Sequence, residues 1–279
     1  AKNIQFSPVR PAGGDRLWDK LSVLGCVPDW VKEICRAMTR ADVLHIRCPA
    51  GISLVSLVAV YLWGSNKPTW VKYAGNWQPH GHEPLSYQIQ RWLLHKDYHR
   101  IIVTVNGSWP NQPKHILTFN NPSMTQEEYN QAAKRAKEKS LSPPIQLLFV
   151  GRIDRAKGID RLLEIAAQLR HQGLNFALTL VGDSPHRRDY EAYTFANHLS
   201  DQVEFTGWLP MYALQPYYQK AHLLIFPSSA SEGWPKVLSE AMAFGVVPVA
   251  SAISSIPQIL DQIGAGKAIP PDQVAKYVE

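Results

Sequence analysis

SSASEGWPKVLSEAMAFGVVPVA, residues 228–250, is the stretch that decides the fold of this chain. Its first part, SSASEGW, is small and polar, as loops are. Pro235 stands at the expected first position of a helix, where its fixed φ is suitable and its missing N–H costs no hydrogen bond. VLSEAMAF has apolar residues at helical spacing, Gly245 is expected to end the helix, and VVPVA is expected to form a buried strand. The stretch therefore predicts a loop, a helix and a strand in succession.

Two carboxylates mark this stretch. Glu232 lies in the loop, and Glu240 lies about a turn and a half into the helix, roughly 8 Å along its axis. On spacing alone, the first is more often a partner for the helix dipole and the second is more often solvent-exposed. The apolar sequence AMAFG after Glu240 argues against a solvated helix face. The pair is therefore a candidate for holding two ends of one polyhydroxyl ligand, with the N–H groups of the helix N-terminus between them.

The second half of the chain alternates strand and helix patterns, which predicts an open, doubly wound parallel sheet. The expected strands are IQLLFVG, FALTLVGD, QVEFTGW, HLLIFPS and VVPVAS, and the expected helices lie near 158–171, 187–199, 210–220, 235–244 and 255–262. In such sheets, ligands bind beyond the carboxyl ends of the strands. The polar segments GRIDRAKG (151–158), GDS (182–184), TGW (206–208) and SEGW (231–234) all follow strands, so we expect them to share one rim.

GRIDRAKG carries two cations beside the start of a helix. Gly151 permits a tight turn, and Arg152 and Lys157 follow it. A planar guanidinium and a compact ammonium near a helix N-terminus are suited to a diphosphate. Two solvated surface charges are the simpler interpretation of this segment by itself.

Taken together, these motifs resemble the donor site of the retaining family-4 (group 1) glycosyltransferases, in which two glutamates are separated by seven residues. The resemblance implies that Glu232 contacts the transferred sugar, that Glu240 holds the nucleotide ribose, and that Arg152 and Lys157 bind the diphosphate. On this basis Glu232, Arg152 and Lys157 are the expected catalytic residues. The expected donor-binding residues are Arg152, Lys157, Gly182, Trp208, Glu232, Gly233, Trp234 and Glu240. The sequence departs from the family pattern at Trp234–Pro235, where Phe-Gly is common, and at Ser254–Ser255, where Gly-Gly is common.

The first half resembles the family only weakly. Helices are expected at 28–40, 51–63, 86–99 and 125–140, and strands at 41–49 and 68–75. Residues 100–110 and 114–124 are each expected to form a strand and then a turn, and residues 1–20 a loop. Asp42 and His45 resemble a strand of the acceptor domain, although His45 by itself is more often a packed histidine. Gly75, Asn76 and Trp77 stand where the family often has a catalytic-site histidine. His80, His82 and Glu83 are residue types that bind metals. At this spacing, on a strand or a helix, their side chains cannot all point in one direction, and no distant ligand is evident. No metal is therefore expected.

Composition narrows the class of protein. The chain has 279 residues, is 45% hydrophobic and carries a net charge of +6, with length for two domains. The charge suits an anionic ligand, a nucleic acid or an anionic membrane, but no basic run is interleaved with aromatic residues, which disfavours nucleic acid. Cys26, Cys35 and Cys48 are too few and too scattered for a disulfide framework or a zinc site. The apolar run 51–63 is too short to span a bilayer.

The resemblance implies a GT-B fold: two Rossmann-like doubly wound domains that face a cleft. Residues 1–140 are expected to be a partial acceptor-binding domain and residues 145–279 a donor-binding domain, with a linker at 141–144. The chain starts with Ala and stops just after Pro270–Pro271, so we expect a fragment that lacks the first strands of one domain and the last helices of the other.

The expected function is transfer of a sugar, with retention, from a nucleotide-diphosphate sugar to a saccharide or a lipid-linked glycan in polysaccharide biosynthesis. No cofactor is expected beyond the donor. The expected location is the cytoplasm, with peripheral association at the inner face of the membrane. A GT-B epimerase or phosphorylase and a non-catalytic nucleotide-sugar-binding subunit remain open alternatives.

Overall fold

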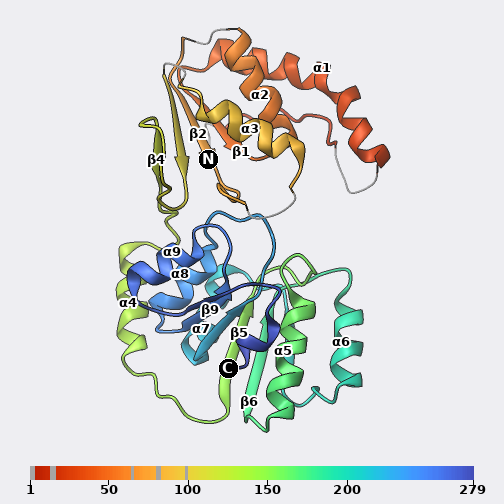
Figure 1. Cartoon of the computed structure of the whole chain (residues 1–279), viewed down its shortest axis with the longest axis vertical. Coiled ribbons are helices and arrows are strands. Elements are labelled where there is room, and N and C mark those ends of the chain that lie inside the picture. The colour runs from red at the N-terminus through yellow and green to blue at the C-terminus, as the bar shows by residue number, and fades with distance from the viewer. Residues whose placement is uncertain (1–3, 13–16, 64–65, 80–82, 98–99) are drawn as a thin grey trace. The chain divides into compact units, whose positions relative to one another are not determined.

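The chain forms two compact units, Ala1–Phe119 (unit 1) and Asn120–Glu279 (unit 2). A computed structural model describes residues 4–12, 17–63, 66–79, 83–97 and 100–279 (Figure 1). Both units are built on parallel sheets, as the alternation of strands and helices predicted.

The described part of unit 1 contains a four-stranded parallel sheet in the order β1-β2-β3-β4. Its inward side chains pack with helix residues such as Leu57 and Leu94 into one core, while His45 and Arg47 on β1 are exposed. Alternate residues of a strand face opposite sides, so the sheet has one buried face and one more open face. The elements are α1 (Leu17–Arg40), β1 (Leu44–Cys48), α2 (Gly51–Leu62), β2 (Thr69–Tyr73), α3 (Leu85–His95), β3 (Ile101–Val105) and β4 (Ile116–Thr118).

Helix α1 is longer than expected, because it begins at Leu17 and passes through Pro28. We expected a loop over residues 1–20 and a helix from Pro28, because proline is common at the start of a helix. The buried Trp30 lies against the start of α2 at Gly51, so tertiary packing supports a helix that local signals alone divide.

Within residues 120–279, all of which are described, a six-stranded parallel sheet has the order β10-β9-β8-β5-β6-β7. This is the order of a doubly wound sheet whose strand order reverses between β5 and β8. All five predicted strands are present. The sixth, β10, was not predicted, since three residues after Gly266 are too few for a periodic pattern. The elements are α4 (Gln126–Ala136), β5 (Ile145–Val150), α5 (Ile159–His171), β6 (Phe176–Val181), α6 (Arg187–Ala196), β7 (Val203–Gly207), α7 (Gln215–Lys220), β8 (Leu223–Phe226), α8 (Lys236–Ala243), β9 (Val247–Ser251), α9 (Ile256–Ile263) and β10, Lys267–Ile269.

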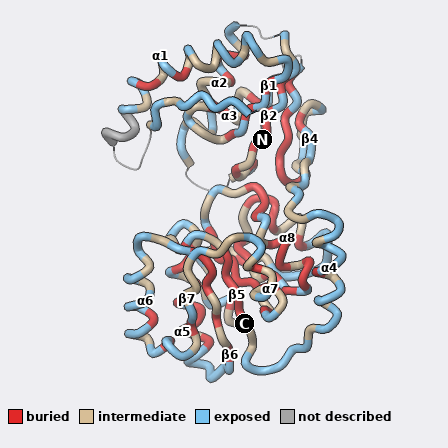
Figure 2. The backbone as a smooth tube through the Cα atoms, turned by 180° about the vertical axis from the view of Figure 1, so that it is seen from behind, coloured by how far each residue is buried: buried red, intermediate tan, exposed pale blue. Residues whose placement is uncertain are grey.

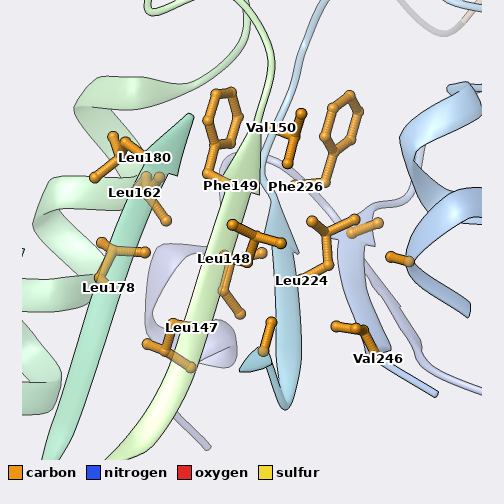
Figure 3. Packing of buried hydrophobic residues seen from close by; sticks show 14 of the residues in the cluster. Leu147, Leu148, Phe149, Val150, Leu162, Leu178, Leu180, Leu224, Phe226 and Val246 are labelled. Carbon is orange, nitrogen blue, oxygen red and sulfur yellow. The ribbon is translucent and has the colours of Figure 1, made fainter. Parts of the chain in front are cut away.

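The core of unit 2 lies along its central strands, where buried residues gather on the sheet (Figure 2). Leu148, Phe149 and Leu178 are at most 1% exposed. The rings of Phe149 on β5 and Phe226 on β8 stack with centroids 6.3 Å apart, near the carboxyl ends of both strands (Figure 3). This packing makes the rim of the sheet at β5 and β8 a rigid base for the loops above it.

The boundary between the units differs from the predicted linker at 141–144. Residues 120–144 belong to unit 2, because α4 packs on α7 and α8 and buries Ala132 completely. The sequence of α4 does not reveal this contact, because its charges are mixed and a single buried alanine leaves little hydrophobic pattern.

The helix of the 228–250 stretch, α8, starts one residue later than predicted, with Pro235 as its N-cap.

Gly158 lies where the loop after β5 meets the loop after β8. It caps α5 with φ +82°, and a Cβ at this position would lie 2.0 Å from the carbonyl oxygen of Pro227. Arg161 donates two hydrogen bonds to the same oxygen, and the N–H of Ser229 donates to the carbonyl of Ala156 at 2.9 Å. The two loops are therefore joined backbone to backbone.

We expect Gly158→Ala to destabilise the fold by well over the roughly 1–2 kcal/mol that a left-handed conformation costs a non-glycine residue. Gly173→Ala is the matched control, since Gly173 has φ +76° but nothing within 4 Å of an added Cβ. Denaturant unfolding of both variants measures the difference. Equal losses would show that backbone strain, and not the contact with Pro227, makes glycine necessary at position 158.

Candidate functional site

A pocket of about 450 Å³ lies at the carboxyl ends of β5, β6 and β7. One side is formed by the ends of the strands, and another by the segment after β7 and by Glu240 of α8. We call it the rim pocket. Its lining residues are Val150, Gly151, Arg152, Val181, Gly182, Asp183, Trp208, Leu209, Met211, Leu214 and Glu240. Four of the predicted donor-binding residues, Arg152, Gly182, Trp208 and Glu240, are among them.

A second pocket, also of about 450 Å³, adjoins the first and shares Val150, Gly151 and Arg152 with it. We call it the loop pocket, because the SEGW loop and the start of α8 line its other side. The remaining lining residues are Lys157, Phe226, Ala230, Ser231, Glu232, Pro235, Lys236 and Val237. Glu240 thus lines the rim pocket, Glu232 lines the neighbouring loop pocket, and Arg152 lines both.

Main-chain atoms meet closely at the ends of β5, β6 and β7, beside the rim pocket. Gly182 has φ +147°, and a Cβ there would lie 1.8 Å from the carbonyl oxygen of Gly151. The N–H of Gly182 donates to the carbonyl of Gly207 at 2.9 Å, so the ends of β6 and β7 are tied together. Glycine at position 182 lets the strand ends approach closely, which leaves their main chain facing the rim pocket.

Lys157 and Glu232 form an ion pair across the loop pocket. The Lys157 ammonium donates to Glu232 Oε1, and Ser228 Oγ donates to the same oxygen at 3.2 Å. Both side chains of the ion pair are about four-fifths buried, at 19% and 21% exposed. The residue expected at the sugar and a residue expected at the diphosphate are therefore neighbours, and a surface-charge interpretation of Lys157 does not fit its burial.

Asp154 organises the loop that carries both cations. Its Oδ1 accepts from the N–H of Lys157 at 2.8 Å, and its Oδ2 lies 2.9 Å from Arg152 Nη2. The Arg152 side chain is 73% exposed, so this pair costs little to exchange for a ligand. Sequence reasoning missed Asp154, although an aspartate that accepts from the N–H three residues on is a common turn signal.

Glu240 is the most buried charged group of the site, at 8% exposed. The hydroxyl of Tyr218, on α7, donates to Glu240 Oε2 at 2.9 Å. Burial raises the pKa of Glu240, whereas the Tyr218 hydrogen bond and the nearby Lys236 act to lower it. The sequence held no signal for Tyr218, because its contact with Glu240 is purely tertiary.

The two tryptophans predicted to bind the donor have different environments. Trp208 is 72% exposed and lines the rim pocket. Trp234 is 8% exposed, belongs to the core and donates its indole N–H to Ser239 Oγ at 2.8 Å. Trp234 is not among the residues that line either pocket, and its expected contact with the donor stays a prediction. Gly233 is buried too, and its carbonyl accepts from Ser255 Oγ at 2.7 Å.

In unit 1, the described candidate residues lie in different surroundings. His45 is exposed and stacks on Trp70 with centroids 4.3 Å apart. Trp77 stands where the family often has a catalytic-site histidine, and it is buried against Tyr73 and His95. His80 and His82 lie outside the described residues. Among the residues that the structure describes, no group of three or more His, Cys, Asp and Glu side chains is placed to hold a metal ion.

The fold is of the GT-B type found in glycosyltransferases. Sucrose-phosphate synthase from Thermosynechococcus elongatus matches it with a TM-score of 0.68 and 20% identity, over 93% of this chain and 68% of that one. HepE of Anabaena, solved in complex with UDP, matches with a TM-score of 0.60 and 15% identity, over 89% of this chain and 72% of that one.

Residues 130–279 match the family described as "Glycosyl transferases group 1", and the chain belongs to this family. It is 28% identical over 137 residues to the putative colanic acid biosynthesis glycosyltransferase WcaL of Escherichia coli (strain K12), which is 47% of this chain and 34% of that protein. The chain therefore aligns with about a third of that relative's length.

The placement of the two tryptophans gives opposite stability predictions. We expect Trp234→Ala to destabilise unit 2 by about 3–5 kcal/mol, as removal of a buried aromatic side chain does. Trp208→Ala should change stability by no more than about 0.5 kcal/mol, since its side chain is exposed. Chemical denaturation of both variants is the measurement, and similar stabilities for the two would contradict the burial of Trp234.

Proposed function

We propose that this chain carries the donor site of a retaining glycosyltransferase that uses a nucleotide-diphosphate sugar. The observation that carries the proposal is the pair of adjoining pockets at the carboxyl ends of the strands, with Arg152 lining both, Glu240 in one, and Lys157 and Glu232 in the other. Nucleotide ligands occupy this position in doubly wound sheets.

The rim pocket is the proposed nucleoside site. A buried carboxylate such as Glu240 accepts hydrogen bonds from paired hydroxyls, which a ribose supplies. Trp208 offers an exposed aromatic face for a base, and the backbone at Gly182 allows close approach. HepE, which shares the fold, has been solved with UDP. The identity of the base is left open in this proposal.

The loop pocket is the proposed site of the diphosphate and the sugar. The bond to the departing diphosphate breaks as the anomeric carbon joins an acceptor oxygen, so negative charge grows on the diphosphate. Arg152, Lys157 and the N-terminus of α5 supply positive charge there without a metal ion. Because Lys157 is already paired with Glu232, a bound donor would exchange this contact for one with phosphate and leave Glu232 to orient sugar hydroxyls. We assign no catalytic base.

The acceptor is proposed to be a saccharide or a lipid-linked glycan in polysaccharide biosynthesis, at the cytoplasmic face of a membrane. The name of the WcaL relative, which refers to colanic acid, supports the polysaccharide part. None of the described helices combines the length and apolar character needed to cross a membrane.

Unit 1 has features that suit peripheral membrane binding. Its sequence contains 14 Lys and Arg residues but only 7 Asp and Glu residues. Helix α3 exposes an apolar stripe, Leu85, Ile89 and Trp92, at spacings of four and three residues, and Trp92 is 60% exposed. Leu62 on the neighbouring α2 is 71% exposed. Apolar side chains on a basic unit are suited to an anionic bilayer surface.

We expect the chain to sediment with vesicles that contain phosphatidylglycerol and less with vesicles of phosphatidylcholine alone. Trp92→Ser and Leu85→Ser should each lower the bound fraction, because each removes apolar area from the stripe. Trp208→Ser is the control, since it removes an exposed tryptophan, 72% against 60% for Trp92, from unit 2. Binding that is unchanged by the unit 1 variants would contradict this docking surface.

Donor binding is the central test. In calorimetric titrations with UDP, GDP and ADP and their glucose conjugates, Lys157→Ala and Arg152→Ala should each weaken nucleoside diphosphate binding by about 1.5–3 kcal/mol. Glu232→Ala should spare the diphosphate and weaken the sugar conjugate. Arg155→Ala is the matched control, because Arg155 lies in the same loop, is 90% exposed and lines neither pocket. Equal effects at positions 155 and 157, or no binding at all, would contradict the proposed site.

A further inference from the structure

Tyr218 and Glu240 form a buried contact between two helices of unit 2. Tyr218 comes from α7 and is 3% exposed, and Glu240 comes from α8 and is 8% exposed. The phenolic hydroxyl donates to Glu240 Oε2 at 2.9 Å. Because an ionised carboxylate only accepts hydrogen bonds, this oxygen is occupied by a defined donor.

The tyrosine is itself held in place. Its ring stacks on Phe244, just after the end of α8, with centroids 5.7 Å apart and planes 15° from parallel. Its hydroxyl therefore approaches Glu240 from a fixed direction. Both residues line a pocket of about 310 Å³, and Met211 and Glu128 also line it. Glu240 lines this pocket and the rim pocket alike.

Tyr218 engages one side of the carboxylate only. Among the described residues, it is the one whose side chain donates a hydrogen bond to Glu240, and Oε1 receives no protein donor from them. A buried carboxylate with one oxygen held by a protein donor and the other without one can accept hydrogen bonds from a ligand that brings hydroxyl donors.

The charged and titratable groups around Glu240 come from three helices and from the loops after β5 and β6. Those that shift its pKa are Tyr218 on α7, Lys236 on α8 and Glu128 on α4, and Arg152 and Asp183 line the rim pocket with it. Burial and Glu128 raise the pKa of Glu240, whereas Tyr218 and Lys236 lower it. Tyr218 therefore favours the ionised carboxylate, which is the form that accepts hydrogen bonds on both oxygens.

We propose that Tyr218 is a positioning residue that holds Glu240 by Oε2 and directs Oε1 into the rim pocket, and that this arrangement selects ribonucleoside over dideoxyribonucleoside diphosphates. The inference rests on the proposed role of Glu240 at the ribose. A ligand without the ribose hydroxyls leaves Oε1 of the buried carboxylate unpaired, which is costly.

The test compares Tyr218→Phe with Tyr217→Phe, a loss of the neighbouring hydroxyl on the same helix. The probes are the nucleoside diphosphate that binds best among UDP, GDP and ADP and its 2′,3′-dideoxy analogue. We expect the wild type and Tyr217→Phe to prefer the ribonucleotide by about tenfold or more, as loss of hydrogen bonds to a charged group implies. Tyr218→Phe should lose most of this preference through weaker ribonucleotide binding, while its affinity for the dideoxy analogue stays unchanged.

The pH dependence gives an independent readout. Ribonucleotide affinity should be highest where Glu240 is ionised and should fall as the pH decreases through its raised pKa. Loss of the Tyr218 hydrogen bond raises that pKa further, so the fall should begin at a higher pH in Tyr218→Phe and stay unchanged in Tyr217→Phe.

The outcomes separate two failures. A wild-type protein that binds no nucleoside diphosphate, or binds one without a preference for ribose, contradicts the proposed function and the inference with it. A wild type that prefers ribose, beside a folded Tyr218→Phe with the same preference and pH profile, overturns the role of Tyr218 alone. Thermal melts establish folding. Phe244→Leu, which removes the ring under Tyr218 but keeps the hydroxyl, should reduce the preference in part.

Discussion

The contact between Gly158 and the Pro227 carbonyl is the constraint on which the site depends. It joins the loop after β5 to the loop after β8, at the point where the order of the strands reverses. Only a residue without a side chain lets the two backbones meet there, and Arg161 donates two hydrogen bonds to the same carbonyl oxygen. Lys157, one residue before the contact, is thereby brought to Glu232, which is 75 positions away in sequence.

Four of the charged groups of the site, Arg152, Lys157, Glu232 and Glu240, have protein partners. Lys157 binds Glu232, Arg152 binds Asp154, and Glu240 accepts from Tyr218. Partners of this kind keep the charges oriented before a substrate arrives, which is the condition for electrostatic stabilisation without reorganisation. The three pairs differ in burial, so Arg152 is the most easily redirected to a ligand and Glu240 is the least.

The two units also differ in charge. The excess of basic residues lies in unit 1, whereas unit 2 has 15 basic and 16 acidic residues. The unit with the proposed site for an anionic donor is therefore close to neutral, and it relies on a few placed cations instead of a general positive field. The field of unit 1 is available for an anionic partner of another kind.

The sequence by itself determined the alternation of strands and helices, the parallel sheets and the segments that meet at the rim of unit 2. Those features follow from hydrophobic periodicity and from the rule that parallel strands place their carboxyl ends on one edge, both of which are local or topological. The family motif directed attention to Arg152, Lys157, Glu232 and Glu240, and the structure places all four on the two pockets.

Only the tertiary structure decided which side chains turn toward the pockets and which are buried beneath them. Trp208 and Trp234 both lie in segments that follow strands, yet one is exposed at the rim and the other lies in the core. Helix α4 belongs to unit 2 through contacts that its polar sequence does not predict. Tyr218, on α7, donates a hydrogen bond to Glu240 on α8. Such pairings depend on distances between segments far apart in the chain, and a periodic pattern reports only the side of an element that is buried, not the residue that it meets.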